Sequence, residues 1–344
     1  MRPTLRVKFE RFWPSFDERD NIFLKALAQD YEVVFNSPPD IVFHSVFPGE
    51  VSSGDPVRVF YTGEPVPPDL KGSDWSFSFD HEDTVRRETH QRMPSYVLST
   101  NIRKFRGDWK NRLVKPDVGP GKRGDRRRSH FCAYIAFHDS FVRCLLFDRF
   151  NRRRPVMAPG RSRHNAPPIQ AGGPKRSRRS RNWQEEKWRY LEDFRFTIAG
   201  ENTSYPGYTS EKLVDAMMAG CIPIYWGNPE VSRDFNTQSF VDVGTYERKE
   251  ASRIPAWLSS RPGLYERIWR HWIMPRAVER AVRRVMEIDD DEDLYHRMLA
   301  EPWFENNEPN EYFDYERFQS RMMEIARTAV ARRAARCTAG SPEP

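Results

Sequence analysis

The stretch that decides the fold is FTIAGENTSYPGYTSEKLVDAMMAGCIPIYWG, residues 196–227. Residues 196–199 predict a strand, and residues 221–226 predict a second strand that is apolar throughout, as a strand covered on both faces must be. Between them, apolar and small residues recur at three- and four-residue intervals from Leu213 to Gly220, which is typical of a helix that packs on a sheet. The pattern therefore predicts a strand, a helix and a second, parallel strand.

Both ends of this helix carry sequence signals. Thr209 or Ser210 can cap its first turn, and Gly220 stands where a helix often ends in a left-handed turn. Residues 201–212 then lie at the carboxyl edge of a parallel sheet, next to a helix N-terminus. Ligands bind in this crevice of open α/β sheets, and the unpaired N–H groups of a helix N-terminus favour phosphate.

The side chains predicted for this crevice suit a sugar nucleotide. Asn202 and Tyr208 can hydrogen-bond and stack, Glu211 can accept from a pair of ribose hydroxyls, and Lys212 can meet a diphosphate. Two charges in the first turn of a helix are equally typical of a solvated surface. The spacing alone leaves both interpretations open.

Residues 201–240 resemble, nearly position for position, the donor-binding signature of the α-1,3/4-fucosyltransferases, glycosyltransferase family 10. The shared pattern is Glu-Asn, Gly-Tyr-x-x-Glu-Lys, Ile-Pro-Ile-Tyr-Trp-Gly and Asp-Phe-Asn. Two departures stand out. Gly200 replaces the usual Phe before Glu-Asn, and Thr209-Ser210 replaces Val-Thr. A glycine at position 200 is expected to loosen the loop that follows.

The resemblance implies an α/β fold of the GT-B class, with two Rossmann-like domains facing a central cleft. It places the acceptor-side domain at residues 1–120 and the GDP-fucose-binding domain at residues 121–302. In residues 303–344 it implies a helix that returns to the first domain and then a disordered tail.

The resemblance also implies an inverting transfer of L-fucose from GDP-fucose to N-acetylglucosamine in a lactosamine-type glycan of the Lewis antigen kind, through an α-1,3 or α-1,4 linkage. By this likeness Arg143 and Lys212 stabilise the departing GDP in place of a metal, while Asn202, Tyr208 and Glu211 hold the nucleotide and the fucose. No cofactor is required, and a divalent metal is at most stimulatory. A transferase that uses another GDP-sugar stays open as the alternative.

In the first part of the chain, strands are predicted at residues 5–9, 31–35, 41–46 and 57–61. The last of them runs into Phe-Tyr-Thr-Gly-Glu, which resembles the segment that carries the general base in bacterial fucosyltransferases, so the resemblance assigns that role to Glu64. A general base works best with a raised pKa, which partial burial beside aromatic residues would supply. Without the resemblance, Glu64 would be a surface glutamate in a turn.

Two further assignments rest on the resemblance. Arg92 and Tyr96 belong to a stretch similar to the family's Arg-x-Pro-x-Tyr, which helps to line the acceptor side, although a structural role suits Arg92 equally well. The strand predicted at residues 130–136 leads into a loop in which Phe137 replaces the family's Asn, and Arg143 then matches the arginine that binds the donor diphosphate.

Charge is distributed unevenly along the 344 residues, whose net charge is +7. Residues 101–181 carry 23 Lys and Arg against five Asp and Glu. We interpret residues 101–128 as a linker with a mobile loop, and three interpretations compete for residues 151–182: a flexible active-site loop, a polybasic patch or a corrupted reading frame, of which we favour the loop. A nucleic-acid or membrane-surface binder on a degenerate transferase scaffold is therefore the alternative from a different class, with no nucleic acid expected for the enzyme.

The four cysteines have no paired spacing, and Cys132 and Cys221 lie in apolar runs that suit a core. The first residues lack the apolar stretch of a signal peptide, and no window is apolar enough to span a membrane. We therefore expect a bacterial family member in the cytoplasm. Two further points stay open: peripheral contact with the inner face of the membrane, and lipopolysaccharide as the carrier of the acceptor glycan.

The C-terminal part reads as helical at residues 183–194, 260–270, 275–288, 291–299 and 312–336. The acidic run at residues 289–293 joins two of these helices, so cap residues are expected there rather than metal ligands. The last helix carries apolar residues on one face and arginines on the other, which fits packing on the first domain or contact with a membrane surface.

Overall fold

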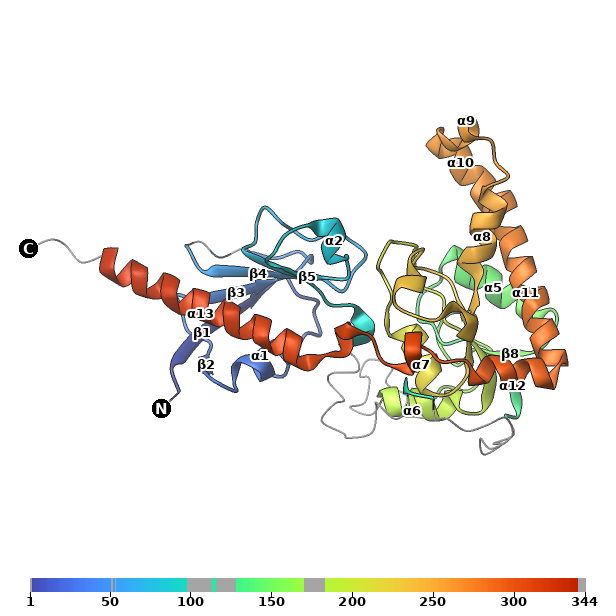
Figure 1. The fold of residues 1–344 in the computed structure, drawn as a ribbon, viewed down its shortest axis with the longest axis horizontal. Coiled ribbons are helices and arrows are strands. Elements are labelled where there is room, and N and C mark those ends of the chain that lie inside the picture. Colours follow the sequence, from blue (N-terminus) through green and yellow to red (C-terminus); the bar gives the residue numbers. More distant parts are fainter. Residues whose placement is uncertain are drawn as a thin grey trace, which may run out of the picture. The chain divides into compact units, whose positions relative to one another are not determined.

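The computed structural model describes residues 2–50, 52, 54–97, 113–115, 128–169 and 183–339 (Figure 1). The chain divides into two compact units. The first unit contains residues 1–105 and 311–344, and the second contains residues 106–310. Each unit is built on one parallel sheet, so the α/β class predicted from the sequence is confirmed.

The first unit has a six-stranded sheet in the order β2-β1-β3-β4-β5-β6. The four strands predicted in this part of the chain are all present, and β5 and β6 extend the sheet beyond them. The strands are β1 (Thr4–Glu10), β2 (Glu32–Val34), β3 (Ile41–His44), β4 (Val57–Tyr61), β5 (Trp75–Ser78) and β6 (His90–Arg92).

Helices α1 (Ile22–Leu27) and α13 (Tyr315–Ala339) complete the core of the first unit, and α2 (Glu82–Val85) precedes β6. Asn21 caps α1, because its side chain accepts a hydrogen bond of 3.0 Å from the Leu24 N–H. Helix α13, the last of the chain, shares this core with the strands and packs on the sheet of the first unit. Its buried face comprises Phe318, Met322, Ile325, Ala326 and Ala329.

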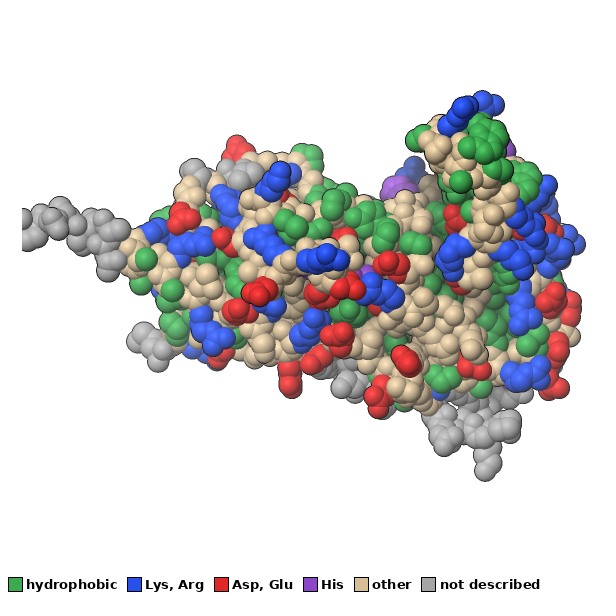
Figure 2. Space-filling view, turned by 45° about the horizontal axis from the view of Figure 1, so that its top comes forward, with side chains coloured by type: hydrophobic (Ala, Val, Ile, Leu, Met, Phe, Trp, Pro, Cys, Tyr) green, Lys and Arg blue, Asp and Glu red, His purple; other side chains and the backbone are tan. Residues whose placement is uncertain are grey.

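The arginines of α13 bind acidic groups of the same unit. Arg332 pairs with Asp74 at 2.9 Å, and Arg333 pairs with Asp40, whose side chain is fully buried, also at 2.9 Å. Burial alone would raise the pKa of both carboxyls, but hydrogen bonds from Arg6, with Arg333, hold that of Asp40 below its ordinary value, and Arg332 does so for Asp74. Figure 2 shows basic and acidic side chains interspersed over this unit.

The second unit has a five-stranded sheet in the order β11-β10-β9-β7-β8. Its strands are β7 (His130–Ala133), β8 (Val156–Met157), β9 (Phe194–Ile198), β10 (Ile222–Tyr225) and β11 (Val241–Asp242). Its helices are α5 (Phe141–Asn151), α6 (Trp183–Leu191), α7 (Glu211–Met218), α8 (Val243–Ala251), α9 (Ala256–Ser259), α10 (Pro262–Ile268), α11 (Met274–Asp290) and α12 (Glu292–Ala300). Short turns of 3-10 helix are η2 (Val231–Arg233), η3 (Thr237–Ser239), η5 (Glu305–Asn307) and, in the first unit, η6 (Glu311–Phe313).

The predicted strand, helix and strand are β9, α7 and β10 in the second unit. Ser210 is the N-cap of α7, and Gly220 adopts a φ of 71°, the left-handed conformation expected after the helix. All four residues of β10 are buried, and it pairs in parallel with β9. Cys132 and Cys221 are buried free thiols, as predicted.

The prediction of a flexible loop over residues 151–182 is wrong for residues 151–169. Val156 and Met157 form β8, which pairs with β7, and Ala158 is fully buried. The side chain of Asn165 accepts from the Ala158 N–H at 2.7 Å and donates to the Val156 carbonyl at 2.9 Å. A side-chain amide thus bonds to the backbone of this short strand and of the residue after it. The arginine-rich composition of the segment gives no sign of this ordered structure.

Two smaller predictions also need correction. The helix predicted at residues 183–194 ends at Leu191, and Phe194 already belongs to β9. In the acidic run, Asp291 caps α12 as expected, but Asp289 is buried and pairs with Arg195 at 2.6 Å.

Some of the predicted segments lie outside the described residues. These are most of the linker predicted at residues 101–128, residues 170–182 and the tail after residue 339. Within the described residues, no helix has the length and apolar character needed to cross a bilayer.

Met322→Ala should destabilise the first unit by about 2–5 kcal/mol, because it removes a fully buried side chain at the contact between α13 and the sheet. Urea unfolding followed by circular dichroism measures the change. Arg327→Ala is the matched control, since Arg327 is exposed on the same helix. Equal unfolding midpoints for the two variants would contradict the assigned packing.

Candidate active site

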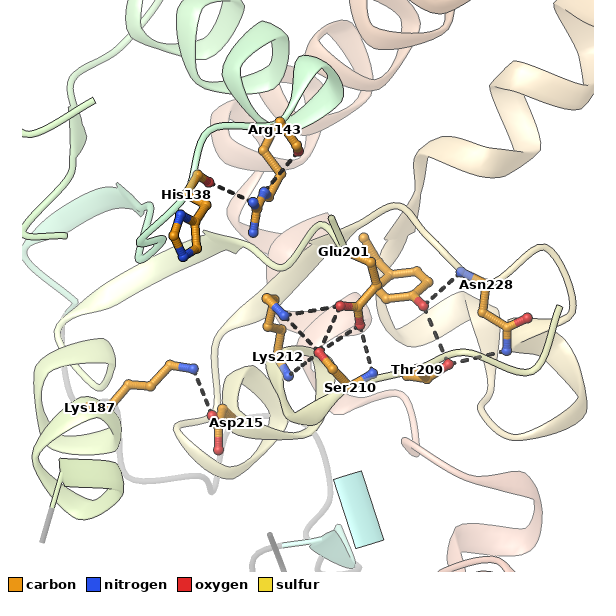
Figure 3. A network of polar contacts seen from close by, with 11 residues as sticks. His138, Arg143, Lys187, Glu201, Thr209, Ser210, Lys212, Asp215 and Asn228 are labelled. Carbon is orange, nitrogen blue, oxygen red and sulfur yellow. Dashed lines mark hydrogen bonds and ion pairs between the residues drawn. The ribbon is translucent and has the colours of Figure 1, made fainter. Parts of the chain in front are cut away.

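The candidate site lies where the strands of the second unit end. Glu201 lies in the loop after β9, Ser210 precedes α7, and Lys212 lies in the first turn of that helix. Because the strands are parallel, their carboxyl ends meet at one edge of the sheet. Figure 3 shows the side chains of these residues converging there.

The carboxylate of Glu201 is fully buried and binds the start of α7. Its Oε1 accepts from the Ser210 N–H at 2.8 Å, and its Oε2 accepts from the Ser210 hydroxyl at 2.7 Å. Lys212 Nζ lies 3.1 Å from the same Oε2 and 2.9 Å from Ser210 Oγ. A buried carboxylate therefore joins the end of β9 to the first turn of α7.

Lys212 places a positive charge at this edge of the sheet, and 23% of its side-chain surface is exposed. Burial disfavours the ammonium ion, but the neighbouring carboxylates of Glu201 and Glu211 outweigh burial and raise the pKa of Lys212 above its ordinary value. The lysine is thus protonated throughout the physiological range. A fixed cation beside a helix N-terminus is suited to binding an anion.

The backbone behind Glu201 is held close to the neighbouring strand. The Glu201 N–H donates to the Trp226 carbonyl at 2.7 Å, and the Ala199 N–H donates to the Ile224 carbonyl at 2.9 Å. A Cβ atom at Gly227 would lie 2.4 Å from Glu201 Cγ, so glycine is required there for space. These bonds continue the ladder on both sides of Gly200.

Asn228 fixes the loop that carries Tyr208. Its Oδ1 accepts from the Gly207 N–H at 2.8 Å, and its Nδ2 donates to Thr209 Oγ1 at 3.2 Å. The Asn228 N–H in turn donates to the hydroxyl of the buried Tyr225 at 3.0 Å. The loop between β9 and α7 is therefore pinned to β10 on both sides of Tyr208.

Arg143 lies in the first turn of α5, and its side chain is held by its own loop. Nη2 donates to the His138 carbonyl at 2.6 Å, and Nε donates to Ser140 Oγ at 2.9 Å (Figure 3). A Cβ atom at Gly200 would lie 3.2 Å from Arg143 Cγ. The glycine that departs from the family pattern thus leaves room for the arginine beside Glu201.

A second buried ion pair sets the position of α7 against α6. Lys187 Nζ lies 2.7 Å from Asp215 Oδ2, and the Trp188 indole N–H donates to Asp215 Oδ1 at 2.8 Å. Gln184 adds a bond of 2.9 Å to the same oxygen. The helix that presents Lys212 is therefore fixed at its far side as well.

The five residues predicted to bind the donor all lie in the loops and first turns at this edge. Asn202 is exposed, Tyr208 is buried, and Glu211 is half-buried beside Lys212. The burial of Tyr208 leaves little of its ring for stacking on a ligand. Arg143 lies against Gly200, which directly precedes Glu201 in the chain.

The residues predicted for the acceptor side lie in the first unit and differ in exposure. Glu64 is exposed in the turn after β4, so the partial burial expected for it is not observed. Arg92 is 1% exposed, donates from Nε to the Phe79 carbonyl at 2.8 Å and lies over the Tyr312 ring at 4.4 Å. Tyr96 is fully buried. Arg92 and Tyr96 thus present no side-chain surface to an acceptor.

Three residues of the site were not assigned a binding or supporting role from the sequence: Glu201, Ser210 in its contact with Glu201, and Asn228. A glutamate directly after an apolar strand is one available signal, because a carboxylate at the edge of a buried sheet needs partners. The spacing to Ser210 is not informative by itself, since it depends on how the loop closes. Among the described residues, no group of three or more His, Cys, Asp or Glu is placed to hold a metal.

Two family models match this chain. The model described as "Alpha-(1,3)-fucosyltransferase FucT N-terminal domain" matches residues 7–99, and that described as "Glycosyltransferase family 10 (fucosyltransferase) C-term" matches residues 162–297. The two ranges together cover well over half of the chain and include the Glu201–Lys212 network. The chain belongs to glycosyltransferase family 10.

Curated relatives of this family 10 chain include "Alpha-(1,3)-fucosyltransferase FucT" of Helicobacter pylori, 26% identical over 282 residues, which cover 71% of this chain and 55% of the relative. "Putative fucosyltransferase R654" of Acanthamoeba polyphaga mimivirus is 29% identical over 121 residues, or 34% of this chain and 19% of the relative. The chain thus spans about half the length of the bacterial relative.

Solved structures of α1,3-fucosyltransferase share the fold of this family 10 chain. The structure with GDP has a TM-score of 0.61 at 21% identity and covers 96% of this chain and 91% of its own. The structure with GDP-fucose has the same TM-score at 19% identity. The GT-B class predicted from the sequence is thereby confirmed.

Glu201→Gln should lower the pKa of Lys212 and destabilise the second unit by about 2 kcal/mol, because the variant removes the carboxylate charge from a buried ion pair. NMR titration of the lysine side chains measures the first effect and urea unfolding the second. Glu287→Gln is the control, since Glu287 forms an exposed pair with Arg284. An unchanged pKa of Lys212 in Glu201→Gln would contradict the role of Glu201.

Proposed function

We propose that this protein is an inverting fucosyltransferase. It transfers L-fucose from GDP-fucose to a hydroxyl of N-acetylglucosamine in a lactosamine-type glycan, through an α-1,3 or α-1,4 linkage. The observation that carries the proposal is the protonated Lys212, anchored by the buried Glu201 at the N-terminus of α7. Family membership supports the donor, since a solved relative of the same fold holds GDP-fucose.

The leaving group explains why a fixed cation is needed at this point. Negative charge accumulates on the diphosphate as the bond to the anomeric carbon breaks, and preorganised donors stabilise that charge. Lys212 directs two of its donors to Glu201 and Ser210, and the third can meet a phosphate oxygen. GDP departs without a metal in this scheme, and a divalent cation is at most stimulatory.

Arg143 is the second cation assigned to the diphosphate. Its guanidinium is oriented by the His138 carbonyl and Ser140, which reduces the entropy lost on binding. Glu211 is assigned to the ribose hydroxyls, and Asn202 to the fucose. Tyr208 is assigned a supporting role, because its ring is buried and its loop is pinned by Asn228.

Glu64 is the base assigned to the acceptor hydroxyl. Direct displacement at the anomeric carbon is assisted by a general base that takes the proton as the new bond forms, and a carboxylate can serve as that base. An exposed glutamate in a turn held by the Thr62 hydroxyl, which accepts from the Glu64 N–H at 3.0 Å, can reach a bound sugar. Arg92 and Tyr96 contribute by shaping the core beneath the acceptor side.

The first experiment is GDP release by the purified protein with GDP-fucose and N-acetyllactosamine. Release that requires both substrates, with none from GDP-mannose, is the expected result. Release from GDP-mannose instead would establish the other GDP-sugar as donor. Failure of the protein to bind GDP in calorimetric titration would overturn the assignment of the site.

Glu64→Gln should lower the rate of fucosyl transfer by at least about a hundredfold while GDP affinity stays within a few-fold, because the base acts on the acceptor and not on the nucleotide. Single-turnover assays and titration calorimetry measure the two quantities. Glu88→Gln is the matched control, since Glu88 is an exposed glutamate of the same unit. Full transfer activity in Glu64→Gln would remove this residue from the mechanism.

A further inference from the structure

A helical arm extends from the second unit, formed by residues 252–272. It contains α9, α10 and the first part of the π-helical turn η4 (Trp269–Ile273), and it connects α8 with α11. Figure 1 shows α9 and α10 at the free end of this arm, away from the sheet of their own unit. Neither helix has a buried residue, so the core does not explain their apolar side chains.

The free end of the arm exposes large apolar groups. Trp257 is 62% exposed and Leu264 is 36% exposed, and they belong to the few large apolar side chains with such exposure among the described residues. Leu258, Tyr265 and Ile268 add half-buried apolar surface nearby in the sequence. A cluster of exposed apolar side chains on a small projection usually marks a contact with another body.

The same end of the arm is strongly basic. The arm carries four arginines against a single glutamate, Glu266, and the Arg261 guanidinium lies 5.9 Å from the centre of the Trp257 ring. Two of the four have acidic partners, since Arg253 pairs with Glu250 of α8 at 3.0 Å and Arg270 pairs with Glu266 at 3.6 Å. Figure 2 shows basic and hydrophobic side chains together at the end of this projection. The arginines are Arg253, Arg261, Arg267 and Arg270.

We propose that the helical arm docks on an anionic membrane surface, with Trp257 and Leu264 entering the interface and Arg261 and Arg267 contacting lipid headgroups. Tryptophan is favoured at the level of the headgroups, and leucine adds aliphatic area that enters the acyl boundary. Arginines near an anionic leaflet add electrostatic attraction and keep their charges in the polar layer.

The combination of arginines with exposed apolar side chains favours a membrane surface over the other possible partners. A second copy of the chain would bring two sets of arginines against each other, which is unfavourable. Single-stranded nucleic acid would use the tryptophan and the charges but would leave Leu264 without a role. A membrane interface uses all three kinds of side chain, because it offers a polar layer to the arginines and an apolar layer to the leucine. The inference does not depend on the transferase activity.

Cosedimentation of the full chain with vesicles tests the proposal. Vesicles of phosphatidylcholine with about 30% phosphatidylglycerol should bind the protein about tenfold or more strongly than pure phosphatidylcholine vesicles. Raising the salt from about 0.1 M to about 1 M should release most of the bound protein, because the electrostatic part is then screened.

Variants assign the binding to the arm. Arg261→Glu/Arg267→Glu should weaken binding to the anionic vesicles at least about tenfold, and Trp257→Ala/Leu264→Ala should weaken it about tenfold. Arg152→Glu/Arg283→Glu makes the same change of charge at two exposed sites of the second unit outside the arm, and it should bind within a few-fold of the unchanged protein. Circular dichroism and GDP titration show that each variant is folded.

Three results would overturn the proposal. The first is equal loss of binding in the arm variants and in the Arg152→Glu/Arg283→Glu control, which would indicate non-specific attraction. The second is equal binding to neutral and anionic vesicles. The third is a dimer, seen by light scattering, that Trp257→Ala/Leu264→Ala converts to a monomer, because the arm would then bind a second copy of the chain.

Discussion

The second unit depends on one buried carboxylate. Glu201 has no exposed surface, and a carboxylate in that position is costly unless each oxygen has partners. Ser210 supplies a backbone N–H and a hydroxyl, and Lys212 supplies a cation. The pair is an unusual choice for stability alone, because apolar residues of similar volume would pack at lower cost. What it achieves is a positive charge with a fixed place at the edge of the sheet.

The elements around that carboxylate are arranged so that it keeps its partners. Gly227 leaves space for the Glu201 side chain, and Gly200 leaves space for Arg143. Asn228 pins the loop on one side of α7, and Asp215 binds α6 on the other. A site built in this way holds its charges before a ligand arrives, so little reorganisation is needed when charge develops on a leaving group.

Secondary structure could be predicted from the sequence where the pattern of apolar residues is local and continuous. The strand, helix and strand of residues 196–227 and the apolar face of α13 follow from periodicity, since a buried face repeats with the period of its element. Over residues 151–169 composition was misleading. There the side chain of Asn165 completes the pairing of β8, and a single amide leaves no periodic signal in a run of arginines.

By itself the sequence determined the two-sheet α/β class, the family and the segment that carries the candidate site, because these depend on local periodicity and on motifs that are contiguous in the chain. Only the tertiary structure decided which polar residues are accessible. It exposes Glu64, buries Arg92 and Tyr96, and pairs Lys212 with Glu201. The burial of a polar side chain depends on partners distant in the sequence, and no local pattern encodes them.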